Sequence, residues 1–216
     1  MKAFIFDLDG VITDSAEDHY LAWKALGEEL DIPFDREFNE TLKGVSRTES
    51  LERILRLGGR EHDFSVEEKE QLATKKNEHY VSLISNITHA DILPGVEAFL
   101  SEIRQAGYKV GMASASKNAH MVTRQLGLLD QFDHIVDAAT VAESKPHPEV
   151  FLKAAEALGV EPKDCIGVED AVAGVEAIHA AGMYTVGIGD PAVLTEADLV
   201  FTDTTGLTLD NVLTRI

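Results

Sequence analysis

The sequence contains only one cysteine, Cys165, among its 216 residues. An intramolecular disulfide is therefore excluded, and such sparing use of cysteine fits a reducing compartment. The neighbours of this residue, Asp164 and Ile166-Gly167-Val168, are typical of a buried strand. We therefore interpret Cys165 as a packing residue rather than a reactive thiol.

Long hydrophobic runs and basic residues are also scarce. No apolar run approaches the roughly 20 residues that a membrane-spanning helix needs, and no charged leader with an apolar segment opens the chain. We therefore expect a cytoplasmic protein without a membrane partner. The 19 Lys and Arg residues stand against 38 Asp and Glu, a formal net charge of −19, which disfavours binding to nucleic acid.

Apolar residues make up 44% of the chain, which is long enough for one large domain or two small ones. From about Leu93 onward, short apolar runs alternate with helical patterns, which predicts a doubly wound, mostly parallel α/β sheet. We predict strands over residues 3–6, 108–113, 134–136, 165–168 and 184–188, and helices over residues 96–105, 119–126, 148–158 and 172–181.

The segment from Ser15 to Asn86 breaks this alternation, because its apolar residues recur at helical spacing and it has no good strand. Three amphipathic faces are expected, formed by Leu21, Ala22, Ala25 and Leu26, by Leu51, Ile54 and Leu55, and by Leu72, Tyr80, Val81 and Ile84. We predict a helical cap domain over residues 15–86, inserted into a core domain of residues 1–14 and 87–216. Since both ends of the insertion return to the carboxyl edge of the sheet, it would form a lid there.

Two carboxylates, Asp7 and Asp9, directly follow the apolar run of residues 3–6. Ligands of open α/β sheets bind outside the carboxyl ends of buried strands. Side chains at positions i and i+2 of an extended backbone point to the same side, so both carboxylates could face one cavity, and a divalent cation would relieve their repulsion. Taken alone, the pair also fits an ordinary Asp/Gly turn.

Three further motifs stand at the ends of later strands. Residues Ser114 to Asn118 offer hydroxyls and backbone N–H groups that suit a phosphate, although Ser and Asn are also common helix caps. Lys145 lies where a cation would balance carboxylates, although a lone lysine is usually solvated. Glu169-Asp170 offers the hard oxygens that Mg²⁺ prefers. Together the four motifs predict a site with a nucleophile, a metal, a cation and phosphate-binding groups.

The order of these motifs, Asp7-x-Asp9-Gly10-Val11, Ser114, Lys145 and Glu169-Asp170, resembles the haloacid dehalogenase superfamily of phosphotransferases across the whole predicted core. The helical insertion is similar to the first type of cap in that superfamily. Within it, the string Leu42 to Arg47, Ser50, His19, Trp23 and Lys76-Asn77 resembles a branch of sugar-phosphate mutases, and the run Ser114 to Asn118 matches the same branch.

The resemblance implies that Asp7 is the nucleophile, forming an aspartyl phosphate, and that Asp9 is the general acid and base for the sugar oxygens. It also implies that Mg²⁺ is held by Asp7, the backbone carbonyl of Asp9, Glu169 and Asp170. The residues that it places around the substrate and its phosphates are His19, Trp23, Lys43, Gly44, Val45, Ser46, Arg47, Ser50, Lys76, Ser114, Ala115, Ser116, Lys117, Asn118 and Lys145.

The implied reaction interconverts β-glucose 1-phosphate and glucose 6-phosphate through β-glucose 1,6-bisphosphate, which acts as the phosphorylating intermediate. Arg47 would bind the second, unreactive phosphate, because its planar fork can hold two oxygens. We expect a monomer whose partners are small sugar phosphates.

Two other functions stay open. A sugar-phosphate phosphatase could use the same core, and a non-catalytic phospho-acceptor module also carries a strand-end Asp with Mg²⁺. The acceptor module would leave Asp9 and the insertion without a purpose. The sequence also leaves open which sugar is bound, glucose or a related phosphosugar.

Overall fold

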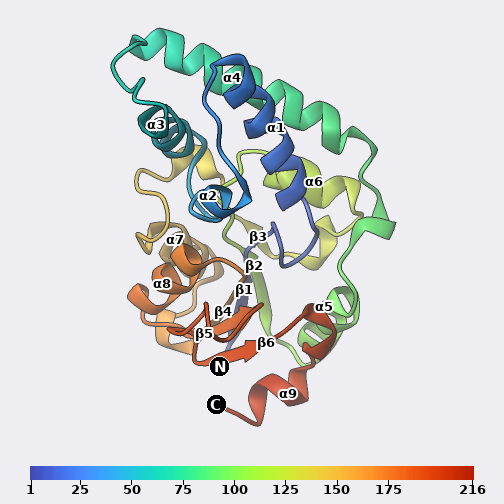
Figure 1. The fold of residues 1–216 in the computed structure, drawn as a ribbon. Helices are drawn as coiled ribbons and strands as arrows, with labels where there is room; N and C mark the ends of the chain where they lie inside the picture. The colour runs from blue at the N-terminus through green and yellow to red at the C-terminus, as the bar shows by residue number, and fades with distance from the viewer.

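A six-stranded parallel sheet forms the centre of the structure (Figure 1). The computed structural model describes residues 1–216. The strands are β1 (Ala3–Phe6), β2 (Lys109–Met112), β3 (His134–Ile135), β4 (Cys165–Glu169), β5 (Tyr184–Ile188) and β6 (Leu199–Phe201). Their order is β3-β2-β1-β4-β5-β6, so the winding direction reverses at β1. The predicted doubly wound α/β fold is confirmed, and its switch point lies where β1 ends.

All five predicted strands are present, each within two residues of its predicted bounds. Besides the short helix α2 (Arg36–Glu40), which lies between β1 and α5, two elements escaped prediction: β6 and the C-terminal helix α9 (Leu209–Leu213), both beyond Gly189. They have three and five residues, too few to show a period in the sequence. Their pairing and packing against the sheet define them.

Helices cover both faces of the sheet, and the two faces are separate hydrophobic clusters. On one face α5 (Val96–Gln105), α6 (Ala119–Gln125) and α9 pack around Phe4 and Phe6 of β1. On the other face α7 (Glu149–Leu158) and α8 (Val172–Ala180) pack around Ala3 and Ile5. The alternation follows from the two-residue repeat of a strand, and it leaves β1 buried on both sides.

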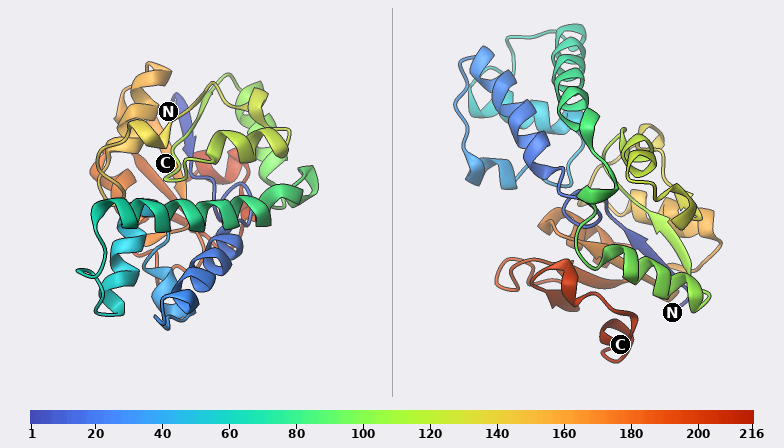
Figure 2. Two further views of the ribbon diagram at one scale, coloured as in Figure 1. Left: turned by 90° about the horizontal axis from the view of Figure 1, so that it is seen from above. Right: turned by 90° about the vertical axis from the view of Figure 1, so that its right-hand side faces the viewer.

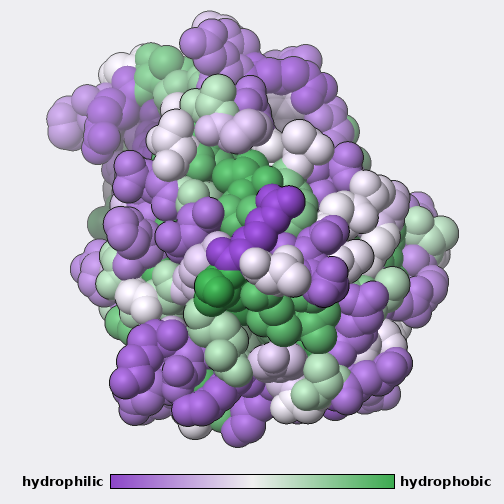
Figure 3. Space-filling view, turned by 90° about the horizontal axis from the view of Figure 1, so that it is seen from below, coloured by the Kyte–Doolittle hydropathy of each residue, from purple (hydrophilic) through white to green (hydrophobic).

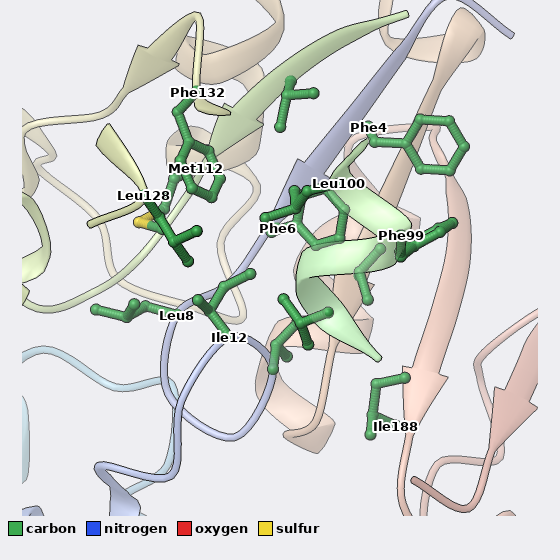
Figure 4. Close-up of a cluster of buried hydrophobic side chains, with 14 of the residues drawn as sticks. Phe4, Phe6, Leu8, Ile12, Phe99, Leu100, Met112, Leu128, Phe132 and Ile188 are labelled. Carbon is green, nitrogen blue, oxygen red and sulfur yellow. The ribbon is translucent and has the colours of Figure 1, made fainter. Parts of the chain in front are cut away.

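Aromatic packing holds β1 in place (Figure 4). The Phe99 ring meets Phe4 edge-on, with ring centroids 5.6 Å apart, and meets Phe6 at 5.9 Å. Phe132 contacts Phe6 from the far side at 6.4 Å. Edge-to-face pairs at such distances add about 0.5–1.5 kcal/mol each beyond the burial of their surface. The strand that presents Asp7 and Asp9 is therefore firmly fixed.

Beyond the carboxyl edge of the sheet lies a layer of helices made by the segment between β1 and α5 (Figures 1 and 2). Its helices are α1 (Ala16–Glu29), α2 (Arg36–Glu40), α3 (Arg47–Leu57) and α4 (Val66–Leu83). We call residues 15–86 the helical insertion. The 3₁₀ turns of the chain are η1 (Ile84–Asn86), η2 (His89–Asp91), η3 (Leu129–Gln131), η4 (Ala138–Thr140), η5 (Pro162–Asp164) and η6 (Thr204–Gly206).

The helical insertion has a hydrophobic cluster of its own, which includes Trp23, Leu26, Leu51 and Ile54. Of the predicted apolar faces, Leu26, Leu51, Ile54 and Leu55 belong to this cluster and Leu72 packs against it, whereas Ala22, Tyr80 and Ile84 belong to the main cluster. Leu21 was expected on a buried face but is 39% exposed. It was placed wrongly because α1 buries the side that carries Ala22, Trp23 and Leu26 instead.

The long helix α4 contributes to two clusters. Leu72 packs against the cluster of the helical insertion, whereas Tyr80 and Ile84 belong to the main cluster beside the sheet. Its N-terminus is fixed by a capping box in which Ser65 and Glu68 satisfy each other's backbone N–H groups. In the view from above, α4 crosses the top of the molecule (Figure 2). This helix therefore joins the two layers mechanically.

The two ends of the helical insertion meet at the sheet. The Thr13 hydroxyl donates a hydrogen bond of 2.7 Å to the carbonyl oxygen of Asp91, and the Leu93 N–H donates one of 2.9 Å to the Ile12 carbonyl. The chain thus enters and leaves the insertion through two adjacent segments at the carboxyl edge of the sheet.

Both termini lie at the opposite end of the molecule (Figure 1). Seen from below, this end shows hydrophobic residues near the middle, divided by a strongly hydrophilic side chain, with hydrophilic residues around them (Figure 3). No helix in the structure has the length and apolar character needed to cross a membrane.

Candidate active site

A cleft of about 120 Å³, open at its mouth, lies between the carboxyl edge of the sheet and the helical insertion. The sequence-predicted residues that line it are Asp7, Asp9, His19, Trp23, Lys43, Gly44, Val45, Ser46, Arg47, Ser50, Lys76, Ala115, Ser116, Lys117 and Asp170. The structure therefore brings together groups that are more than 160 residues apart in the sequence. Four predicted residues, Ser114, Asn118, Lys145 and Glu169, lie outside the lining of the cleft.

A buried ion-pair network lies beneath the floor of the cleft. The Lys145 Nζ donates to Asp7 Oδ1 at 2.7 Å and to Glu169 Oε2 at 2.8 Å. The side chains of Lys145 and Glu169 are fully buried, and that of Asp7 is 6% exposed. Burial lowers the pKa of Lys145, but the two carboxylates outweigh burial and hold it above its usual range. Lys145 is therefore a permanent cation next to Asp7.

Three carboxylates crowd together at the ends of β1 and β4. Asp7, Glu169 and Asp170 each offer an oxygen, and these oxygens lie within 4.8 Å of one another. Burial, followed by the charge of Asp7, raises the pKa of Glu169 to about 7. Burial and the charge of Glu169 raise the pKa of Asp170 well above its ordinary value. The carboxylates therefore repel one another, and they fit a hard divalent cation such as Mg²⁺, which would relieve that repulsion.

Two glycines make room for these carboxylates. A Cβ at Gly10 would lie 2.2 Å from Asp170 Oδ2, and Gly10 has a φ of +77°, a conformation that favours glycine. A Cβ at Gly174, in the first turn of α8, would lie 2.0 Å from the Glu169 carboxylate. The acidic cluster therefore depends on the absence of side chains at both positions.

The Asp9 carboxylate stands apart from this cluster and faces the helical insertion. Its Oδ1 accepts a hydrogen bond from the Ser15 hydroxyl, and its Oδ2 lies 3.8 Å from His19 Nε2. Burial, followed by the charge of Asp7, raises the pKa of Asp9 to about 6. A carboxyl group with a pKa near neutrality can both give and take a proton, which is the property of a general acid and base.

A polar pair on the helical insertion faces Asp9. The Lys76 ammonium donates to His19 Nδ1 at 2.7 Å and lies 4.6 Å from the centre of the Trp23 ring. The His19 ring stacks on Tyr80 with centroids 3.8 Å apart. Burial, followed by the positive charge of Arg47, lowers the pKa of Lys76 to about 7. Burial and Lys76 hold the pKa of His19 well below its usual value, so His19 is neutral.

The other cations of the helical insertion differ in their partners. Lys43 lies 2.8 Å from Glu40 and 3.9 Å from Asp170, so it reaches toward the acidic cluster. Arg47, the first residue of α3, lines the cleft, and its guanidinium has no hydrogen bond or ion pair with the protein. Burial lowers the pKa of Arg47, but a guanidinium stays charged at any physiological pH. Its charge is therefore available to an anionic ligand.

The loop after β2 supplies the polar groups on the sheet side. Ser114 is buried, and its hydroxyl accepts the Ser116 N–H at 3.1 Å. The Asn118 Nδ2 donates to the side-chain Oδ1 of Asn77 on α4 at 2.8 Å, which ties this loop to the helical insertion. Asn118 is therefore a bridge between the two layers, outside the lining of the cleft.

Sequence reasoning missed several residues of the cleft. These are Ala16, Asn39, Thr48 and Ala138 as lining residues, together with Ser15 as the partner of Asp9, whereas Leu42 was named in the string Leu42 to Arg47 but not as a residue of the site. Leu42 and Ser15 lie in or next to segments that the sequence motifs had already marked as part of the site. For α2 the only signal in the sequence is Asp35, a typical N-cap residue, whose side chain accepts the Phe38 N–H. Nothing in the sequence alone indicates that Asn39 faces the cleft.

Comparison with known proteins finds relatives along most of the chain. The haloacid dehalogenase-like hydrolase family matches residues 1–182. The chain is 51% identical over 210 residues to the β-phosphoglucomutase of Bacillus subtilis (strain 168), which covers 97% of this chain and 93% of the relative. It is 32% identical over 184 residues to the fructose-1-phosphate phosphatase YqaB of Escherichia coli (strain K12), covering 85% and 94%.

A solved structure is equally similar. The crystal structure of β-phosphoglucomutase (pgmB) from Clostridium difficile has a TM-score of 0.98 with this chain and is 49% identical to it. The match covers all of this chain and 96% of that one. Fold, helical insertion and sheet therefore correspond over the full length.

Proposed function

The chain belongs to the haloacid dehalogenase-like hydrolase family, and from this premise we propose that it is a β-phosphoglucomutase, an Mg²⁺-dependent isomerase of β-glucose 1-phosphate and glucose 6-phosphate. One observation carries the proposal beyond the 51% identity to such an enzyme. The cleft is lined by the nucleophile Asp7 from the sheet and by the cation Arg47 from the helical insertion, which suits a sugar that carries phosphate at either end.

Asp7 is the proposed nucleophile. Lys145 holds Oδ1, whereas Oδ2 has no hydrogen bond with the protein and can attack phosphorus. In the proposed cycle, phosphorylated Asp7 gives its phosphoryl group to the 6-hydroxyl of β-glucose 1-phosphate, which forms β-glucose 1,6-bisphosphate. The bisphosphate turns end for end, and Asp7 then takes the phosphoryl group from the sugar O1, so that glucose 6-phosphate is released.

Asp9 would move the proton in both half-reactions. It takes the proton of the attacking 6-hydroxyl and returns it to O1 when the bond from O1 to phosphorus breaks. The pKa of about 6 suits both roles near neutral pH. Asp7, Glu169, Asp170 and the backbone carbonyl of Asp9 would hold Mg²⁺, which when bound would neutralise phosphate charge. Lys145 and Ser114 would balance and position the transferring group.

Residues 15–86 would act as a cap domain that excludes water. Without such a cover, water would attack the aspartyl phosphate and the enzyme would be a phosphatase. The close seating of the two layers supports this function: a Cβ at Gly44 of the insertion would lie 3.4 Å from the Lys145 side chain. Cytoplasmic location and the monomeric state remain predictions from the sequence.

The test is a coupled assay that measures glucose 6-phosphate formed from β-glucose 1-phosphate. A mutase requires Mg²⁺ and is stimulated by trace β-glucose 1,6-bisphosphate. The main alternative is a sugar-phosphate phosphatase, and the observation behind it is the 32% identity to a fructose-1-phosphate phosphatase. Steady release of inorganic phosphate from several sugar phosphates, without stimulation by bisphosphate, would favour that alternative and overturn the proposal.

A further inference from the structure

Asn39 is a polar residue in the wall of the cleft with no function in the cycle described above. It lies on α2, whose first turn is fixed by the Asp35 side chain accepting the Phe38 N–H at 2.9 Å. Asn39 and Leu42, which lies in the turn that follows α2, both line the cleft. In Figure 1, α2 lies on the side of the helical insertion that faces the sheet.

The Asn39 side chain is buried and has no partner in the protein. The residue is 9% exposed, and its backbone N–H and carbonyl are used by Asp35 and Leu42. The carboxamide makes no hydrogen bond with any other group of the chain. Its oxygen and nitrogen are nevertheless not sealed off, unlike the enclosed Tyr80 hydroxyl. The remaining access of the carboxamide is therefore to the cleft that Asn39 lines.

A buried amide without a partner costs free energy, so its presence in a wall indicates a ligand that satisfies it. The chemistry of that ligand is given by the group itself. A neutral carboxamide both donates and accepts, as a sugar hydroxyl does, whereas a phosphate is bound by cations. Arg47, Lys43, Lys76 and Lys117 already supply cations to the same cleft.

We propose that Asn39 reads one of the non-reacting ring hydroxyls of the sugar, at C2, C3 or C4, and is thereby a specificity-determining residue of this enzyme. The inference rests on the proposed function, because it assigns a sugar-reading group to the same site. A site built to hydrogen-bond a hydroxyl rejects an analogue that lacks it, since the protein group is then left unpaired.

The experiment compares two proteins on four substrates, in the manner of a double-mutant cycle. The wild type and Asn39→Ala are assayed with β-glucose 1-phosphate and with its 2-deoxy, 3-deoxy and 4-deoxy analogues. We expect Asn39→Ala to lower kcat/KM for the parent sugar by about tenfold, the usual size for one lost hydrogen bond. For one analogue, the wild type should lose a similar factor, and Asn39→Ala should then lose nothing more.

Two controls separate recognition from folding. Phe38→Leu changes the neighbouring residue on α2, which packs in the cluster of the helical insertion and does not line the cleft. Its effect should be equal for all four sugars. The melting temperature of ligand-free Asn39→Ala should not fall, because a partnerless amide is removed. If that variant does not fold, Asn39→Ser takes its place in the cycle.

An equal loss for all four substrates, or no loss for the parent sugar, would overturn the role of Asn39. The assays of the wild type in the same experiment test the proposed function separately. If the wild type only hydrolyses these sugar phosphates, the proposed isomerisation is wrong. The two proteins are then compared by their rates of phosphate release from the four sugars. Asn39→Ala should still remove the dependence of that rate on one hydroxyl.

Discussion

The sheet side and the insertion side of the cleft carry opposite charge. The ends of β1 and β4 supply Asp7, Asp9, Glu169 and Asp170, with only Lys145 buried among them. The helical insertion supplies Lys43, Arg47 and Lys76, two of which have no carboxylate as hydrogen-bonded partner. In a chain of net charge −19, these cations are concentrated where a dianionic substrate must bind.

The two sides also differ in how firmly they are built. The acidic groups stand on strands buried on both faces, whereas the cations stand on helices around a small cluster of their own. We infer a division of labour: bond making and breaking belong to the sheet, and recognition and exclusion of water belong to the insertion. Four predictions test this division, from the largest expected effect to the smallest.

Asp7→Asn should abolish all chemistry. Loss of the nucleophile prevents phosphoryl transfer to the enzyme, so both isomerisation and ester hydrolysis should fall by about 10⁴-fold or more. Rates are measured with β-glucose 1-phosphate and with an aryl phosphate, and folding is checked by thermal melting. Residual activity above one-tenth of wild type with either substrate would contradict the role of the sheet side.

Asp9→Asn should remove proton transfer while leaving fold and Mg²⁺ binding intact. We expect isomerisation to fall by about 10²–10⁴-fold, the usual contribution of general acid and base catalysis. Phosphorylation of Asp7 by an aryl phosphate, whose leaving group needs no proton, should fall much less. Mass spectrometry of the phosphoenzyme and a coupled assay measure the two rates. Near-normal isomerisation would count heavily against the assignment.

Arg47→Ala should affect the two substrate classes differently. Isomerisation, which needs the second phosphate, should fall by about 10–100-fold, while hydrolysis of a small phosphate ester should change little. Arg53→Ala is the matched control, because Arg53 lies on the same helix, bonds Glu49 and the Thr41 carbonyl, and does not line the cleft. Equal losses for both substrates would contradict the role of Arg47 in binding the second phosphate.

Lys76→Met should change the pH dependence of stability. The pKa of Lys76 is about 7 in the folded chain and 10.5 as its ordinary value, so between these pH values the unfolded state binds more protons. This residue therefore makes stability rise with pH in that window, by at most about 1.4 kcal/mol per pH unit. The variant should lose that slope in urea titrations at pH 7 to 10. An unchanged slope would mean that Lys76 stays protonated when buried.

Most of the sheet could be read from the sequence because buried parallel strands are short apolar runs between helical patterns. β6 and α9 could not, since so few residues show no period. Leu21 shows the limit for amphipathic helices: several residues can satisfy the spacing, and packing against α4 decides which side is buried.

The candidate site divides in the same way. Asp7, Lys145 and Glu169 follow recognisable strands, so the sequence placed them at one edge of the sheet. Asn39 had no such marker, because whether its amide faces a cleft depends on how the short helix α2 is seated. The roles of all these residues in catalysis and binding stay predictions until the variants are measured.

The sequence by itself determined the parallel sheet, the position of the helical insertion in the chain and the strand ends at which acidic residues gather. Tertiary structure alone decided that Ser15 bonds Asp9, that Lys76 bonds His19, and that Asn39 has no partner. The physical reason is the distance along the chain between the residues that interact. Strand and helix patterns are local properties of neighbouring residues, whereas the partner and the pKa of a buried polar group depend on chains brought together only by folding.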